Sequence, residues 1–249
     1  MAIFCSPLSP EGMSNLKVSV PPAPESTATQ GPTATSTSTS APTPTLDPKD
    51  PRSSLGEPTK RDTMDSAVSW IWPTGDSEYT SLEFKDGQML MTGLTNYVGW
   101  RLANPAGYGL GNMYLEMQVN SGNCSGSDQY GVIFRSPVLQ DADRGYLFGF
   151  SCDGRYGLRR WDGKDGPNGK MTWLKAWTSD KAIVSGSNQN NRLGLLVNGS
   201  RISLYANGVY LADFTDATWT AGYLGVYIGA IETKNYTARI DEIAYWENP

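Results

Sequence analysis

The chain has 249 residues, with 20 Lys and Arg against 25 Asp and Glu, a formal net charge of −5 and no histidine. The acidic balance argues against nucleic acid and anionic membranes, which both attract clustered Lys and Arg. The lack of histidine excludes Ser-His-Asp and Cys-His catalysis and every His-ligated metal site, and the 3 cysteines are too few for a four-cysteine zinc site. No apolar run approaches the length of a membrane span.

The N-terminal part of the chain is predicted to be a tail, residues 1–20, of unclear role, followed by a linker, residues 21–64. Between Pro21 and Thr45, 12 of 25 residues are Ser or Thr and 6 are Pro. Such a segment cannot bury enough apolar surface to offset the entropy of ordering it, and its prolines favour an extended conformation. We therefore expect residues 1 to about 62 to be disordered and to act as a tether.

Cys5 lies close to the first residue, where Met1–Cys5 resembles the remnant of a lipoprotein signal. Phe4 occupies a position where a small residue is expected, and no basic segment precedes it. A mis-assigned start or a fragment of a longer protein is the favoured explanation.

From Tyr79 onward, short apolar and aromatic runs alternate with Gly, Asn and Asp, which is the pattern of strands and tight turns. Asp86-Gly87, Asn198-Gly199 and Asn207-Gly208 each predict a two-residue hairpin turn. The expected strands are 79–84, 89–92, 97–102, 113–120, 130–136, 145–152, 155–161, 172–177, 192–197, 201–206, 209–214, 223–229 and 238–246.

Residues 113–120 show the alternation clearly, because Leu115, Met117 and Val119 share one face while Tyr114 and Glu116 lie on the other. No segment keeps a helical period over ten residues. We therefore predict an all-β domain over residues 65–249, built as a two-sheet antiparallel jelly-roll sandwich.

Four segments carry a resemblance to the concanavalin A-like lectin/glucanase superfamily: 129–135, 145–151, 192–209 and the closing run 240–246. Laminin G-like domains and the bacterial 3-keto-disaccharide hydrolase type domain are the members that it resembles most. The resemblance covers roughly residues 65–249 and implies the jelly-roll fold. It leaves the activity open, because the superfamily contains lectins, adhesion modules and glycosidases.

Cys124 and Cys152 flank the expected hairpin of 130–136 and 145–152. If this hairpin turns near Gln140, residue 130 lies opposite about residue 151, and Cys124 comes within reach of Cys152. The tether indicates export, and disulfides persist in oxidising compartments, so we predict a Cys124–Cys152 disulfide. The alternative is two buried thiols.

No catalytic residue is predicted. Glycosidases of the superfamily place two carboxylates on one strand in the spacing Glu-x-Asp-x-Glu, and this motif is absent here. Glu116 has no acidic partner two residues away, and Asp76 with Glu78 is interpreted as a pair of solvated loop charges. A carboxylate pair assembled from separate strands stays open.

The segment 153–162, followed by Trp173 and Trp177, carries the residue types that bind sugars. Aromatic rings stack on the apolar face of a pyranose, while charged and amide groups bond its hydroxyls. Leu158 is assigned to the core, which leaves Arg159 and Trp161 facing outward with Arg135 as a possible neighbour. The alternative is that Trp161 packs under a loop and the arginines are ordinary surface charges.

The loop 162–169 resembles a calcium loop superficially, but it lacks the alternating oxygen ligands and terminal Glu of an EF-hand. A long exposed hairpin loop is the simpler interpretation, and we expect no cofactor, with calcium as the alternative.

Taken together, these features predict a monomeric, extracellular or surface-tethered lectin-like module with a carbohydrate ligand. The alternatives are a glycoside-cleaving enzyme of the same fold and a non-catalytic adhesion domain with a protein partner.

Overall fold

The computed structural model describes residues 49–140 and 142–249, which form fifteen strands and one 3-10 helix, Pro51–Ser53. None of the helices in this part of the chain is long and apolar enough to cross a membrane. The strands are β1 (Lys60–Asp62), β2 (Gly75–Asp76), β3 (Thr80–Lys85), β4 (Gln88–Gly93), β5 (Val98–Ala103), β6 (Met113–Asn120), β7 (Gln129–Ser136), β8 (Arg144–Ser151), β9 (Arg155–Asp162), β10 (Lys170–Ser179), β11 (Asn190–Asn198), β12 (Arg201–Ala206), β13 (Val209–Thr215), β14 (Tyr223–Gly229) and β15 (Thr237–Glu247).

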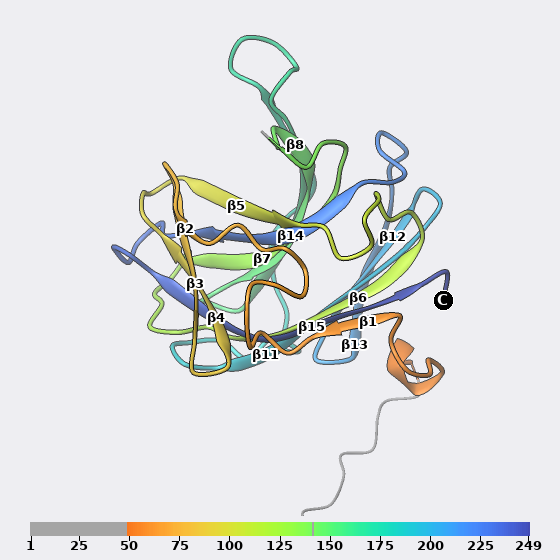
Figure 1. Ribbon diagram of the computed structural model, residues 1–249, viewed down its shortest axis with the longest axis horizontal. Helices are drawn as coiled ribbons and strands as arrows, with labels where there is room; N and C mark the ends of the chain where they lie inside the picture. Colours follow the sequence, from red (N-terminus) through yellow and green to blue (C-terminus); the bar gives the residue numbers. More distant parts are fainter. Residues whose placement is uncertain (1–48, 141) are drawn as a thin grey trace, which may run out of the picture. The chain divides into compact units, whose positions relative to one another are not determined.

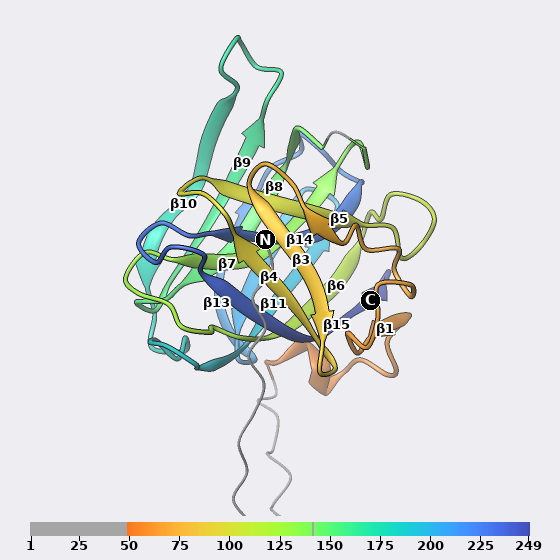
Figure 2. The same cartoon turned by 60° about the vertical axis from the view of Figure 1, so that its left-hand side comes forward.

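The strands form two antiparallel sheets that face each other as a jelly-roll sandwich (Figure 1). One sheet has nine strands in the order β13-β12-β11-β6-β15-β4-β3-β2, with β1 paired to β15 off this path. The other has six strands in the order β10-β9-β8-β7-β14-β5. The hairpin of β9 and β10 projects beyond the sandwich (Figure 2). The predicted all-β fold class is confirmed.

The core lies between the two sheets, and strand alternation decides which side chains enter it. On β6, Leu115, Met117 and Val119 are buried in the core cluster, as the sequence predicts. On β9, Leu158 is fully buried in the same cluster. Side chains at alternate positions point away from the core, so each sheet also presents an outer face.

Each of the thirteen predicted strands is present, with bounds that shift by two residues at most, whereas β1 and β2 are additional. Asp86-Gly87 and Asn207-Gly208 form the expected turns, and all four residues have positive φ between 52° and 83°. The third turn is displaced by one residue: Asn198 pairs with Arg201, so the loop is Gly199-Ser200. Gly199, with φ 56°, supplies the left-handed conformation there.

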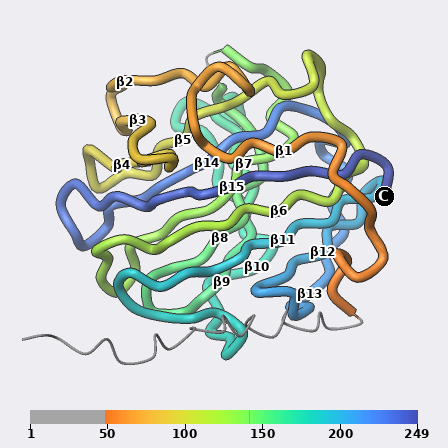
Figure 3. The backbone as a smooth tube through the Cα atoms, turned by 60° about the horizontal axis from the view of Figure 1, so that its bottom comes forward, coloured from red at the N-terminus to blue at the C-terminus, as the bar shows by residue number. Residues whose placement is uncertain are grey.

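The N-terminal boundary of the sandwich differs from the expected one. Residues 49–64 were expected to belong to the disordered linker, but β1 lies beside β15 (Figure 3), with Lys60 paired to Tyr245. Met64 is fully buried. The entropy argument applies to the Ser/Thr/Pro-rich stretch that ends at Thr45, whereas the residues after it include apolar and charged side chains that pack on the sheet. Residues 1–48, with the tail and most of the expected linker, lie outside the described residues.

The predicted disulfide is present. Cys124 and Cys152 are bonded, with their α-carbons 5.8 Å apart. The register explains the pairing, because Gln129 lies opposite Ser151 on β7 and β8, and each cysteine lies just beyond its end of this ladder. Cys124 follows β6 of the nine-stranded sheet and Cys152 follows β8 of the six-stranded sheet, so the bond ties the two sheets together.

Candidate functional site

The outer face of the six-stranded sheet carries a row of side chains that the strand register aligns. Leu102, Gly225, Ile133 and Leu147 lie opposite one another across β5, β14, β7 and β8, and Arg159 continues the row on β9. The aliphatic members of this row are nearly buried although they point away from the core. The loops around the sheet therefore cover part of this face.

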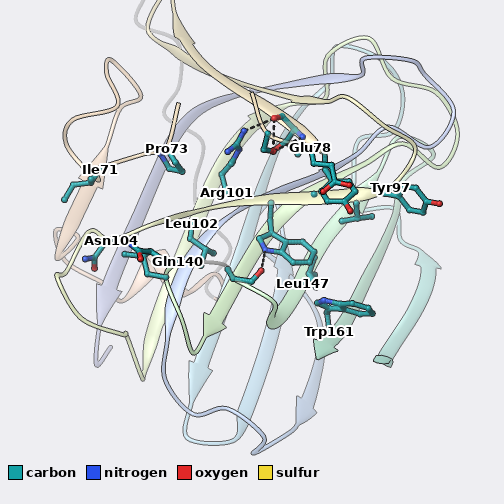
Figure 4. Close-up of a pocket in the computed structure, with 18 of the residues that line it drawn as sticks. Ile71, Pro73, Glu78, Tyr97, Arg101, Leu102, Asn104, Gln140, Leu147 and Trp161 are labelled. Carbon is teal, nitrogen blue, oxygen red and sulfur yellow. Dashed lines mark hydrogen bonds between the residues drawn. The ribbon is translucent and has the colours of Figure 1, made fainter. Parts of the chain in front are cut away.

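A groove with a volume of about 1010 Å³ lies on this face. Ile71 and Pro73 lie at one end of it and Tyr97 and Trp161 at the other (Figure 4). It is lined by residues before β3, five of the six residues of β5, the loop between β7 and β8, and single residues of β8, β9 and β10. The lining residues are Ile71, Pro73, Ser77, Glu78, Tyr79, Thr80, Tyr97, Val98, Gly99, Trp100, Arg101, Leu102, Asn104, Leu139, Gln140, Ala142, Leu147, Trp161 and Met171.

Exposed apolar side chains concentrate at this groove. Of eleven exposed large apolar residues in the described part of the chain, four line it: Ile71, Tyr79, Tyr97 and Met171. Ile71 and Tyr97 are 71% and 67% exposed. A cluster of exposed apolar side chains around one concavity marks a binding site more strongly than scattered ones do.

Several polar groups of the lining are already bonded within the protein. The Trp100 indole N–H donates to the Ala142 carbonyl at 2.9 Å. The Arg101 guanidinium donates to the carbonyls of Gly75 and Thr80 at 2.8 and 2.7 Å. Burial lowers the pKa of Arg101, and the nearby charge of Asp76 opposes this shift.

Glu78 is the only acidic residue among the described residues that line the groove. Its hydrogen bond with the Tyr79 hydroxyl raises the pKa of Tyr79. Glu78, which was interpreted as a solvated loop charge, thus belongs to the lining of the groove. Glycoside hydrolysis requires two carboxyl groups, about 5–5.5 Å apart for retention and about 6.5–9.5 Å apart for inversion.

Trp161 is the one predicted sugar-binding residue that lines the groove. It is half-buried, because the far edge of its ring packs on the hairpin between β9 and β10. A Cβ on Gly169 would lie 2.5 Å from the Trp161 ring, so glycine is needed at that position. One side of the ring is thus held by the hairpin.

Arg159 lies on the outward side of β9, as expected, but it is covered. Its guanidinium carbon lies 5.2, 5.6 and 5.3 Å from the ring centroids of Trp173, Trp177 and Tyr227. It donates to the Gln129 side-chain oxygen at 2.6 Å, and burial lowers its pKa. With 4% of its surface exposed, Arg159 supports the two tryptophans from below and does not present its charge to solvent, which corrects the expected exposure.

Trp173 and Trp177 lie beside the groove and do not line it. Their rings meet edge to face with centroids 6.2 Å apart, and 46% of Trp173 is exposed. A Cβ on Gly157 would lie 3.1 Å from Trp177 and 3.4 Å from Trp173, so this glycine leaves room for both rings.

Arg135 lies elsewhere, which corrects its expected position beside Arg159. The ladder between β14 and β7 shifts register near it, and Arg135 has a positive φ of 51°. This conformation redirects the side chain, which is fully buried and donates to the Trp219 and Gly111 carbonyls at 3.3 and 3.4 Å.

The loop 162–169 uses its acidic groups within the hairpin. Asp162 accepts a hydrogen bond from the Lys164 backbone N–H at 3.0 Å, and Asp165 pairs with Lys170 at 3.4 Å. Among the described residues, no group of three or more Cys, Asp or Glu side chains is arranged to hold a metal ion.

Trp100, Tyr79 and Tyr97 also line the groove, although the sequence did not mark them as candidate site residues. These residues come from β5 and the ends of the loops beside it, which meet the strand of Trp161 only in the folded sandwich. A signal was present, because Val98, Trp100 and Leu102 share a face opposite small Gly99 and Ala103. Alternation shows that these faces differ, but it does not say which one is turned to the core.

No family model and no curated protein matches the chain. Solved structures do resemble it. Carbohydrate-binding module CBM66 from Bacillus subtilis has a TM-score of 0.57 and 15% identity, covering 72% of this chain and 98% of that one. A protein of unknown function with a galectin-like fold from Bacillus subtilis has a TM-score of 0.55 and 12% identity, covering 77% and 96%. The GlcNAcα1-4Gal-releasing endo-β-galactosidase from Clostridium perfringens has a TM-score of 0.51 and 10% identity, covering 76% and 62%.

The fold is a concanavalin A-like jelly roll. At these identities the similarity establishes the fold alone. These neighbours include a carbohydrate-binding module and a carbohydrate-cleaving enzyme, so the fold does not distinguish between the two functions. A function for this chain has to be inferred from its groove.

Proposed function

We propose that this concanavalin A-like domain is a carbohydrate-binding module whose ligand lies in the groove on the six-stranded sheet. The observation that carries the proposal is the groove itself: Trp100, Trp161, Tyr79 and Tyr97 surround a space of about 1010 Å³. Aromatic rings of this kind stack on pyranose faces. The volume lies at the upper end of the range for small-molecule sites, about 300–1,000 Å³, which suits an oligosaccharide segment.

Binding is favoured over hydrolysis because Glu78 has no acidic partner among the described residues of the lining. The similarity to a carbohydrate-binding module supports the same function, and the similarity to an endo-β-galactosidase keeps the enzyme as the rival. Trp173 and Trp177, supported by Arg159, would extend the binding face beyond Trp161.

The Cys124–Cys152 disulfide supports a location outside the cytosol, since disulfides persist in oxidising compartments. We propose that the module is secreted or tethered at the cell surface and acts as a monomer.

A printed glycan array probed with the full chain tests the function. We expect binding to at least one glycan, with Tyr97→Ala weakening it by roughly 5- to 30-fold, the equivalent of about 1–2 kcal/mol for one lost stacking partner. Tyr210→Ala is the matched control, because Tyr210 is an exposed tyrosine on β13, outside the groove, and its loss should leave binding unchanged. Chromatography of the bound glycan after incubation separates the module from the enzyme, since only the enzyme releases shorter products.

A further inference from the structure

The groove holds one positive charge between its ends. Arg101 is the only Lys or Arg among the described residues that line it. Its side chain lies between Pro73 on one side and Glu78 with Tyr97 on the other (Figure 4). A ligand that fills the groove therefore meets the guanidinium group.

Arg101 and Trp100 flank the same space. They are neighbours on β5, so their side chains point to opposite sides of the strand. β5 is the last strand of the six-stranded sheet and has β14 as its one neighbour in that described sheet. Because both side chains nevertheless line one groove, the groove follows the free edge of β5, with Trp100 on one wall and Arg101 on the other. A sugar ring that stacks on Trp100 has Arg101 within the same space.

Arg101 is held by one of its nitrogens and keeps the other two unused. Nη2 donates to the carbonyls of Gly75 and Thr80, which fixes the guanidinium before a ligand binds. Nε is buried and has no hydrogen-bond partner among the described residues. Nη1 makes no hydrogen bond within this part of the chain either, but it is not buried, so a ligand in the groove can reach it.

The charge of Arg101 is not balanced inside the groove. No ion pair of the described residues includes Arg101. Asp76, whose carboxylate acts on it electrostatically, lies outside the lining. Burial lowers the pKa of Arg101 more than the charge of Asp76 raises it, so the cation has lost hydration without gaining an equivalent partner.

An oxyanion is the group that fits this position best. A neutral hydroxyl can accept a hydrogen bond from Nη1, but it leaves the charge uncompensated. A carboxylate or sulfate forms a charge-assisted hydrogen bond, which is roughly twice as strong as a neutral one. Since Nη1 is not buried, the anion keeps part of its water and avoids the full desolvation cost of a buried ion pair.

We propose that the groove recognises an acidic glycan, in which a uronic acid carboxylate or a sulfate ester accepts a hydrogen bond from Nη1 of Arg101 while a sugar ring stacks on Trp100. This inference rests on the proposed carbohydrate-binding function and names the ligand class of the same groove. Glu78 lies toward one end of the groove, so it opposes a second negative charge there and favours glycans whose charges are isolated.

The test uses an array of acidic polysaccharides, each printed as isolated, after reduction of its carboxyl groups to alcohols, and after removal of its sulfate esters, beside neutral polysaccharides. The full chain should bind at least one acidic polysaccharide about 5- to 10-fold more tightly than its neutralised form. This ratio is the equivalent of about 1–1.4 kcal/mol, the extra strength of a charge-assisted hydrogen bond. Loss of the preference on carboxyl reduction identifies a uronic acid, and loss on desulfation identifies a sulfate ester.

Arg101→Gln removes the charge and keeps an amide N–H group that can donate to the Thr80 carbonyl. We expect the ratio between the acidic and neutralised chains to fall toward one, while binding of the neutralised chain persists. Arg61→Gln is the matched control: Arg61 is 42% exposed on β1 and lies outside the groove, so the ratio should stay as in the original chain.

Asp76→Asn tests the same charge and leaves every residue of the lining in place. Without the attraction of Asp76, Arg101 should favour the anionic group more strongly, and the ratio should rise by about 1.5- to 3-fold, as for an exposed charge pair. Glu83→Gln is its control, because Glu83 is exposed on β3 outside the groove and its loss changes the net charge equally.

Equal binding of acidic and neutralised chains, or binding of neutral polysaccharides alone, would overturn the acidic-glycan inference and leave the carbohydrate-binding function standing. No binding to any spot would overturn both. A ratio that Arg101→Gln retains would overturn the inference, because the anion would then contact another part of the protein. If Arg101→Gln does not fold, Asp76→Asn decides, since a ratio unchanged from the original chain would overturn the contact with Arg101.

Discussion

The outer face of the nine-stranded sheet is covered by residues 50–56, whereas the outer face of the six-stranded sheet is open as a groove. On the covered face, Tyr114, Tyr205 and Trp246 pack with Leu55, and the Trp246 indole N–H donates to the Gly56 carbonyl at 2.7 Å. On the open face, aromatic side chains of the same kinds have no such cover.

The charges of the two faces show the same contrast. Glu116 on the covered face pairs with Arg192 at 2.7 Å and with Arg52 at 2.8 Å, and Arg192 also pairs with Asp50. Glu116 and Asp50 have 2% and 1% of their side chains exposed. On the open face, Glu78 is exposed and no cation is paired with it among the described ion pairs. The face whose charges are paired within the protein contributes to stability, whereas the face whose groups are left unpaired is available to a ligand.

The largest expected effect comes from breaking the covered face with Arg192→Ala. This change leaves two buried carboxylates, Asp50 and Glu116, with Arg52 as the remaining cation nearby. Removing one partner of a buried ion pair costs about 3–5 kcal/mol, so the free energy of unfolding in urea should fall by that amount.

Acid should relieve part of this loss. Burial raises the pKa of Glu116, opposed by Arg192 and by hydrogen bonding from Tyr114. When folding raises the pKa of a carboxyl, the folded protein becomes less stable as the pH rises through that pKa. The difference in unfolding free energy between the variant and the original chain should therefore shrink at low pH. Arg201→Ala, which breaks an ion pair whose Arg is 66% exposed, is the control and should lower the free energy of unfolding far less, because solvent screens an exposed pair. A similar cost for both variants would show that the covered face is not held by its charges.

The disulfide is the next largest contribution, because it joins the sheets that carry the two faces. Cys124 and Cys152 are 28 residues apart, and closing a loop of this length should stabilise the domain by roughly 3.5 kcal/mol, with measured values often lower. Reduction should lower the melting temperature while the far-ultraviolet circular dichroism spectrum stays that of the native sheet. The Cys124→Ser/Cys152→Ser variant, insensitive to reductant, is the control, and an unchanged melting temperature on reduction would contradict the prediction.

The open face is tested by Trp161→Ala. We expect glycan binding to weaken by about 1–2 kcal/mol, because one stacking ring is lost. The cost in stability should be modest, since the ring is half-buried. Trp70→Ala is the matched comparison: Trp70 is 1% exposed in the core, and its loss should cost about 3–5 kcal/mol of unfolding free energy. Normal binding by a stable Trp161→Ala protein would direct attention to Trp173 and Trp177.

Strand positions could be predicted because both signals are local in the sequence: side chains alternate with a period of two within each strand, and turn residues follow it. β10 shows this: Trp173 and Trp177 were expected on a strand and lie on one. The surroundings of the site could not be predicted in this way. Arg159 is covered by Trp173 and Trp177 from β10 and by Tyr227 from β14, so its burial depends on residues distant in the sequence.

The position of Arg135 and the packing of residues 49–64 on the covered face were predicted wrongly, for two further physical reasons. A register shift and a positive φ redirect Arg135, and strand alternation carries no information about either. Residues 49–64 follow a low-complexity stretch directly, and their packing depends on complementary charges on β6 and β11 that are more than 50 residues away.

The smallest predicted effect concerns Asp216, whose hydrogen bonds connect the two sheets. It follows β13 of the nine-stranded sheet and accepts from the Tyr146 hydroxyl on β8 and from Arg160 on β9, at 2.6 and 2.5 Å. Burial alone would raise the pKa of Asp216, but the hydrogen bonds from Tyr146 and Thr218 and the charge of Arg160 outweigh it and lower the pKa.

A carboxyl whose pKa is lowered on folding contributes stability above its usual pKa and loses it as the pH falls through the lowered value. Asp216→Asn should therefore cost a few tenths to about 1 kcal/mol at neutral pH, the range of a partly exposed ion pair, and progressively less toward pH 3. Urea unfolding of both proteins between pH 7 and pH 3 measures this convergence. A difference that stays constant over this range would assign the contribution of Asp216 to packing and not to its charge.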